Sequence, residues 1–228
     1  MITLFNEDCM SLMARYPDKH FDLAVCDPPY GIGEDWKKRK IGYKEKRFVE
    51  TSYKNDSIPT KAYFDELKRV SKDQIIFGYN YFTELLGPTN YLIIWDKLCS
   101  DSYLKYSRAE IAYTSIKIPV RIFRVPWDGC RMGKETGKKK IHPHQKPVEL
   151  YVQILRTYAK YGWKILDTHM GSGSSVIACH MLGLDAVATE IDGHYFATAR
   201  KRIDLEIKQQ ELFTAKELRL ESLFEEAI

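Results

Sequence analysis

The segment KILDTHMGSGSS, residues 164–175, predicts a short buried strand, a glycine turn and the start of a helix. Gly171 and Gly173 lack side chains, so the backbone of the turn can approach a ligand closely. Ser174 is placed to cap the helix that follows. A second apolar run, DAVATE at 185–190, ends in Glu190, an acid suited to hold the two hydroxyls of a ribose. Together these runs predict a strand, turn, helix and strand unit with a ligand at the turn.

The rest of the chain continues this alternation of strands and helices. Strands separated by helices predict an α/β fold with a doubly wound, mostly parallel sheet. The strands are expected at 2–5, 21–26, 74–77, 91–95, 164–167 and 185–190, with antiparallel strands near 110–116 and 119–125. The helices are expected at 9–16, 61–70, 80–86, 147–160, 174–182 and 193–212.

A second motif, DPPY at residues 27–30, follows the apolar run FDLAVC. That run predicts a buried strand, which delivers Asp27 to the crevice at the carboxyl edge of a parallel sheet. Pro28 and Pro29 stiffen the turn and remove two N–H donors, so the Pro28 carbonyl becomes a fixed acceptor beside the Asp27 carboxylate. Tyr30 adds a flat ring. Two acceptors and a stacking ring suit a nucleobase that carries an exocyclic NH2 group, although such a motif also occurs as a rigid loop.

Two basic runs contain glycine and lie outside periodic segments, so they predict surface loops. One is residues 36–47, within a loop at about 31–58, and the other begins at Arg131, within the less regular stretch at about 98–140. The first follows DPPY and the second precedes HPHQKP at 142–147. Two basic loops beside a base pocket predict contact with a phosphate backbone, and a solvated face is the alternative. The candidate DNA-binding residues are Lys37, Lys38, Arg39, Lys40, Arg47, Arg131, Lys138, Lys139 and Lys140.

At 228 residues the chain is long enough for one sizeable domain, expected over residues 1–228 with a helical tail at about 204–228. No apolar run reaches the ~18 residues of a membrane helix, and the N-terminus does not have the form of a signal peptide. The five cysteines contain no CxxC pair, which argues against a disulfide frame and favours a reduced, cytoplasmic setting. No metal is predicted, because the pair His142 and His144 lacks an evident third ligand.

Four motifs, in this order, resemble those of the β-class DNA amino-methyltransferases, which use S-adenosylmethionine (SAM). The motifs are DPPY at 27–30, HPHQKP at 142–147, LDTHMGSGS at 166–174 and ATEID at 188–192, and the likeness covers about residues 2–202. The resemblance implies a Rossmann-like sheet of the seven-stranded type with a circularly permuted motif order, in which the target-amine motif precedes the cofactor motif. It also implies SAM as the cofactor and DNA as the substrate.

The resemblance assigns roles to single residues. It implies that the turn Gly171, Ser172, Gly173 and Ser174 packs against SAM and that Glu190 holds its ribose. Lys146 is expected near the methionine moiety. The adenine ring is expected near Asp8, for which a helix N-cap is an equal alternative. Asp167 is expected either to orient the turn or to face the cofactor.

The expected reaction is direct methyl transfer to adenine N6. Asp27 and the Pro28 carbonyl would accept the two N–H bonds of the amine and aim its lone pair at the sulfonium methyl group. The base would be flipped out of the duplex, and Tyr30 would stack on it. Within the family, Asp at the first motif position favours adenine N6, whereas Ser is commoner for cytosine N4. Cytosine N4 and an RNA substrate stay open as alternatives.

Two other classes of protein share part of this pattern. Gly171 and Gly173 followed by Glu190 imitate a fingerprint for NAD, but Val176 stands where a dehydrogenase has its third glycine. An inactive DNA-binding paralogue is favoured by Thr168 and His169, where the family usually has Pro and Phe; the intact DPPY argues against it. Double-stranded DNA is the expected partner. The sequence leaves open a homodimer, a restriction endonuclease partner and the recognition sequence.

Overall fold

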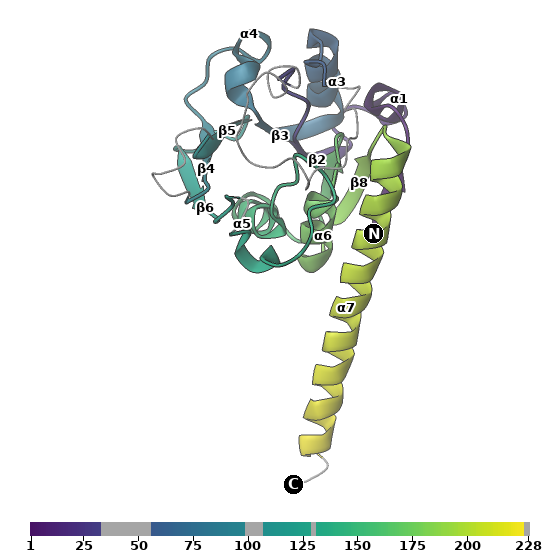
Figure 1. The fold of residues 1–228 in the computed structure, drawn as a ribbon. Helices are drawn as coiled ribbons and strands as arrows, with labels where there is room; N and C mark the ends of the chain where they lie inside the picture. Colours follow the sequence, from purple (N-terminus) through teal and green to yellow (C-terminus); the bar gives the residue numbers. More distant parts are fainter. Residues whose placement is uncertain (33–55, 99–106, 129–130, 226–228) are drawn as a thin grey trace.

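A computed structural model describes the backbone of residues 1–32, 56–98, 107–128 and 131–225, and side chains in these ranges as far as residue 210. In this part of the chain, eight strands form one sheet in the order β1-β8-β7-β2-β3-β5-β4-β6 (Figure 1). The strands are β1 (Ile2–Phe5), β2 (Phe21–Cys26), β3 (Ser71–Phe77), β4 (Leu92–Asp96), β5 (Ala109–Thr114), β6 (Arg121–Arg124), β7 (Lys164–Asp167) and β8 (Asp185–Thr189).

The first five strands of this order, β1, β8, β7, β2 and β3, are all parallel. The predicted α/β fold with a mostly parallel sheet is therefore confirmed, with eight strands in the described sheet rather than seven. The antiparallel pair expected over 110–116 and 119–125 is wrong in part. Strand β5 is antiparallel to β3 and β4, but β6 is parallel to β4. Since β3 and β4 occupy both edges of β5, β6 pairs with the remaining edge of β4.

Helices cover both faces of the sheet (Figure 1). Along β2, side chains alternate between the two faces: Ala24 and Cys26 pack with residues of α1 and α3, whereas Leu23 and Val25 pack with residues of α5 and α6. The helices are α1 (Cys9–Met13), α3 (Lys61–Val70), α4 (Thr83–Leu86), α5 (Val148–Tyr158), α6 (Ser174–Met181) and α7 (Gly193–Glu225), with 3-10 turns η1 (Tyr79–Tyr81) and η2 (Gly133–Glu135).

Helix α7 has 33 residues and joins the helix expected at 193–212 and the helical tail expected at about 204–228 into one continuous element. Its first turns are anchored by the buried side chains of Tyr195, Ala199 and Ile203. At 1.5 Å per residue the helix is about 50 Å long, and its second half extends away from the sheet (Figure 1). In the described ranges, no helix combines the length and the apolar character needed to cross a membrane.

The start of α6 differs from the sequence prediction. Gly173, not Ser174, occupies the N-cap, with φ +76° and ψ 16°. Ser174 is instead the first helical residue, and its hydroxyl contacts Ser172 Oγ at 3.1 Å. The left-handed backbone at Gly173 turns the chain into the helix directly, which leaves no extended residue to serve as a side-chain cap.

Candidate active site at the carboxyl edge of the sheet

The predicted site residues follow the carboxyl ends of neighbouring parallel strands. Asp8 lies just beyond β1, Glu190 follows β8, Asp167 ends β7 and Asp27 follows β2. From β7 the chain continues to β8, its neighbour towards the β1 edge of the sheet. From β2 it continues to β3, its neighbour towards the opposite edge, so the direction of winding reverses between β7 and β2. Open α/β sheets bind ligands at such a switch point. The topology thus brings the two halves of the predicted site to one crevice.

Asp27 is held by two donors from different parts of the chain. Its side chain is 14% exposed. The hydroxyl of Tyr30 donates to Oδ1 at 2.5 Å, and the ammonium of Lys146 donates to Oδ2. Lys146 Nζ also lies 3.2 Å from the Tyr30 hydroxyl. The DPPY and HPHQKP motifs therefore meet, and Lys146, expected near the cofactor's methionine moiety, contacts Asp27.

Lys146 is buried and has a second anionic neighbour that sequence reasoning missed. Its Nζ lies 3.0 Å from Oε2 of Glu110 on β5, and Glu110 Oε1 lies 2.6 Å from the ammonium of Lys97. Burial opposes ionisation, but Lys146 and Lys97 hold the pKa of Glu110 below its usual range. Against the same cost of burial, Asp27 and Glu110 raise the pKa of Lys146. Asp27, Lys146, Glu110 and Lys97 thus form a row of four charges of alternating sign.

The ring of Tyr30 is enclosed by the segment after β3. It stacks on Tyr81 with centroids 4.9 Å apart and an interplanar angle of 13°, and it meets Phe82 edge-on. Gly78 makes this possible: a Cβ there would lie 2.2 Å from Tyr30 Cε1. Burial and the Asp27 charge raise the pKa of Tyr30 well above its usual value, so the hydroxyl keeps its proton and donates to Asp27.

Two carboxylates fix the glycine turn. Asp167 accepts hydrogen bonds from the His169 amide at 3.0 Å and from the Ser175 hydroxyl. Glu190 accepts the amides of Gly171 at 3.0 Å and Asp192 at 2.9 Å. Burial raises the pKa of Asp167 to about 7, and the charges of Asp27 and Glu190 add to that rise. The acidic groups of the crevice are therefore close enough to repel one another.

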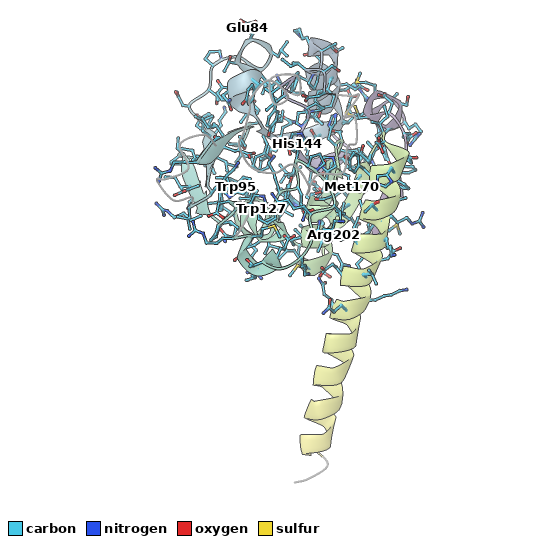
Figure 2. The ribbon with its side chains drawn as sticks, in the orientation of Figure 1. Glu84, Trp95, Trp127, His144, Met170 and Arg202 are labelled. Carbon is cyan, nitrogen blue, oxygen red and sulfur yellow. The ribbon has the colours of Figure 1, made fainter. Side chains whose placement is uncertain are left out.

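Arg202 of α7 supports the same turn from outside, which the sequence did not indicate (Figure 2). Its guanidinium donates to the Ser172 carbonyl and to Ser174 Oγ, both at 2.9 Å. A third bond reaches Glu135 at 2.9 Å, and Glu135 also accepts the Val148 amide at the start of α5. These hydrogen bonds connect the turn to α7 and, through Glu135, to the start of α5.

Asp8 caps α1. Its Oδ1 accepts the amides of Met10 at 2.9 Å and Ser11 at 3.2 Å. The N-cap role considered for Asp8 is therefore present.

The glycine turn is covered by His142, which is only 6% exposed. A Cβ on Gly171 would lie 3.4 Å from the His142 ring, and that ring packs edge-on against Tyr195 with centroids 4.5 Å apart. Its Nδ1 accepts the His144 amide at 3.2 Å, which requires neutral imidazole. Across the described ranges, no cluster of three or more His, Cys, Asp or Glu side chains is arranged to hold a metal ion.

Buried His142 should make the protein sensitive to acid. Burial, together with the charges of His144 and Lys146, lowers its pKa to about 3, while the unfolded chain takes up this proton near pH 6.5. Its contribution to stability is full above pH 6.5 and is lost as the pH falls towards 3. Between pH 6.5 and 5 the loss is about 2 kcal/mol. Urea unfolding at pH 7 and at pH 5 measures this loss. The free energy of unfolding should fall between these pH values by about 2 kcal/mol less in His142→Gln than in the wild type; an equal fall in both proteins would contradict the prediction.

The candidate DNA-binding residues divide into two groups. Lys37, Lys38, Arg39, Lys40 and Arg47 lie outside the described residues. Among the others, Arg131 pairs with Asp128, and Lys138 pairs with Glu206 at 2.6 Å. Lys140 lies over the Trp127 ring, 5.0 Å from its centroid, and Lys139 is exposed. Three of these four cations are thus engaged within the protein.

The doubly wound sheet, with its crevice at a topological switch point, defines the class of Rossmann-like α/β proteins. Within that class, residues 89–201 match the model of the DNA methylase family of N6/N4 type, and the resemblance to DNA amino-methyltransferases is confirmed. Its sequence is 22% identical to the type II methyltransferase M.HpaI of Haemophilus parainfluenzae over 241 residues, covering 89% of this chain and 74% of that one.

Two solved structures share the fold. The M1.HpyAVI–SAM complex has a TM-score of 0.58 at 18% identity and covers 89% of this chain and 99% of that chain. The cytosine-N4-specific PvuII DNA methyltransferase also has a TM-score of 0.58, at 11% identity, and covers 91% of this chain and 92% of its own. The same architecture therefore accompanies a cytosine-N4 enzyme.

Proposed function

We propose that the protein transfers the methyl group of SAM to the exocyclic N6 amine of adenine in double-stranded DNA. The observation that carries this proposal is the position of Asp27. Its carboxylate follows β2 at the switch point, beside the Pro28 carbonyl and next to the strand that leads into the glycine turn. An acceptor pair for an amine thus adjoins a turn suited to a cofactor.

The residues at the glycine turn suit SAM. Its sulfonium carries a positive charge, and Asp8, Asp27, Asp167 and Glu190 make this edge of the sheet acidic. Each oxygen of Glu190 accepts one backbone amide, and a carboxylate oxygen has a further lone pair for a ribose hydroxyl. When bound, SAM supplies an electrophilic methyl group. Gly171, Ser172, Gly173 and Ser174 would pack against it.

Asp27 and Pro28 would prepare the target amine, whose lone pair is delocalised into the base. Among the described residues, no donor reaches the Pro28 carbonyl, so this oxygen is open to one N–H while Asp27 accepts the other. The nitrogen would then become pyramidal and attack the methyl carbon in line, forming the N–C bond as the S–C bond breaks. The surplus proton would leave through the Asp27 carboxylate to water. Positioning supplies most of the acceleration in this scheme.

Tyr30 would stack on the base once it has left the duplex. Stacking on an aromatic side chain is worth about 1–3 kcal/mol per base and would offset part of the cost of flipping. In the free protein one face of Tyr30 is covered by Tyr81, which is 42% exposed. Tyr81 would have to move aside for a base on that face.

Adenine is preferred over cytosine because Asp27, rather than Ser, opens the motif. The carboxylate offers a charged acceptor for one N–H of the amine, beside the Pro28 carbonyl that accepts the other. Cytosine N4 stays the second candidate because the PvuII enzyme, which shares this fold, is cytosine-N4-specific. RNA is the third.

The DNA backbone would run over the basic segments on either side of the crevice. We propose contacts from Lys37, Lys38, Arg39, Lys40, Arg47, Arg131, Lys138, Lys139 and Lys140. Since several of these pair with acids of the chain, DNA would have to compete for Arg131 and Lys138. We further propose that the protein acts as a cytoplasmic enzyme.

The proposal is tested with SAM labelled with tritium in its methyl group. The protein is incubated with mixed-sequence duplex DNA and, separately, with RNA of the same sequence, and SAM and NAD binding are measured by calorimetry. We expect SAM to bind, NAD not to bind, and label to enter the DNA. Label found only in RNA would mean that RNA, and not DNA, is the substrate. NAD binding without SAM binding would overturn the proposal.

Gly78→Ala should impair transfer by moving Tyr30. The new Cβ would lie 2.2 Å from the Tyr30 ring, so the ring and its hydrogen bond to Asp27 must shift, which we expect to slow transfer at least about tenfold. Gly162→Ala is the control, because Gly162 has the similar φ of +77° but no atom within 4 Å of its Cβ. Single-turnover rates measure both. Equal rates for the two variants would contradict the positioning role of Tyr30.

A further inference from the structure

Both oxygens of Asp27 are already occupied. Tyr30 donates to Oδ1 and Lys146 donates to Oδ2. A target amine needs an acceptor on this carboxylate, and a buried ammonium is a strong competitor for it. If Lys146 simply released Asp27, it would keep only the longer hydrogen bond to the Tyr30 hydroxyl, at 3.2 Å, in a place where only 5% of its side chain is exposed. Such a loss is costly unless another acceptor stands ready.

Glu110 offers that acceptor. Its Oε1 is paired with Lys97 at 2.6 Å. Its Oε2 is buried and accepts no hydrogen bond from a described residue, although it lies only 3.0 Å from Lys146 Nζ. The distance already fits a hydrogen bond, but the angle between the two side chains does not. A small shift of the Lys146 side chain away from Asp27 would therefore make the bond without moving the backbone.

We propose that Glu110 is a positioning residue that receives the Lys146 hydrogen bond when the target amine reaches Asp27. The inference rests on the proposed function and deepens it. In the free protein Lys146 holds Asp27 in place; in the complex the ammonium turns to Glu110 Oε2, and Asp27 Oδ2 accepts the amine. Lys146 stays paired throughout, so Asp27 keeps its full charge for the substrate.

The experiment compares Glu110→Gln with Glu66→Gln. Glu66 is a matched control, because its side chain is 22% exposed against 21% for Glu110, and it pairs with a cation, Arg69, at 2.6 Å on α3. With a neutral amide at 110, Lys146 should stay on Asp27. We expect the single-turnover rate on duplex DNA to fall about tenfold and the SAM dissociation constant to stay within threefold. Glu110→Asp should recover part of the rate, and Glu66→Gln should match wild type.

A double-mutant cycle with Lys146→Met separates this role from a structural one. If Glu110 acts through Lys146, Glu110→Gln should change the rate less than twofold in the Lys146→Met background. Equal tenfold effects in both backgrounds would overturn the inference. So would a wild-type rate for Glu110→Gln in an active preparation. A wild-type protein that binds SAM but labels no DNA would instead overturn the proposed function, and the inference with it.

Discussion

Asp27→Ala is expected to reduce methyl transfer about 1,000-fold, the scale on which losing one preorganised polar group affects catalysis. The variant removes the acceptor for one amine N–H and the partner of Tyr30 and Lys146. The glycine turn lies on the neighbouring strand and keeps its own contacts with Glu190, so SAM affinity should stay within a few-fold. Single-turnover transfer and SAM calorimetry measure the two effects separately.

Asp27→Asn is the control for this prediction. It keeps the size of the side chain and one acceptor oxygen but removes the charge, so its rate should lie between those of the wild type and Asp27→Ala. If Asp27→Ala lost SAM binding and transfer together, Asp27 would belong to the cofactor site, and the proposed roles would have to be reassigned.

Gly173→Ala is expected to destabilise the fold by about 3 kcal/mol. A side chain at φ +76° costs about 1–2 kcal/mol. Its Cβ would lie 2.6 Å from Ile203 Cδ1 and 2.9 Å from Cγ1, and such overpacking costs about 1–3 kcal/mol. Because the turn must shift, SAM should also bind more weakly. Urea unfolding and SAM calorimetry measure these effects.

Gly162→Ala separates the two causes. Gly162 has φ +77°, but no atom lies within 4 Å of its Cβ, so it should show only the backbone cost. Equal losses of stability for the two variants would mean that the Ile203 side chain moves away from the new Cβ at no measurable cost in free energy. Unchanged SAM binding in Gly173→Ala would mean that the turn does not carry the cofactor.

Much of the fold follows from local pattern. Apolar runs such as residues 21–26 and 164–167 predicted β2 and β7 with their observed bounds, because a buried strand needs little beyond its own apolar side chains. The partner of β6 could not be predicted in this way. It depends on β5 entering the sheet between β3 and β4, which is a property of the whole chain.

The place of the candidate residues in the fold was predictable where a motif holds them in adjacent positions, as in DPPY after β2. The contacts of Lys146 were not, because its partners Asp27 and Glu110 are distant in sequence and only the folded sheet brings them together. Glu110 sits in an otherwise ordinary strand, AEIAYT, and no local signal marks it. The cap of α6 was misassigned for another reason: Ser174 is a good N-cap by residue type, but the left-handed backbone of Gly173 takes that position.

The central claim is that the crevice around Asp27 methylates an adenine amine in DNA. It is tested most directly by incubating duplex DNA with SAM and the protein, digesting the product to nucleosides and identifying the methylated base by mass spectrometry, with Asp27→Ala in parallel. We predict N6-methyladenine with the wild type and none with the variant. N4-methylcytosine as the product, or N6-methyladenine formed equally by Asp27→Ala, would contradict the account.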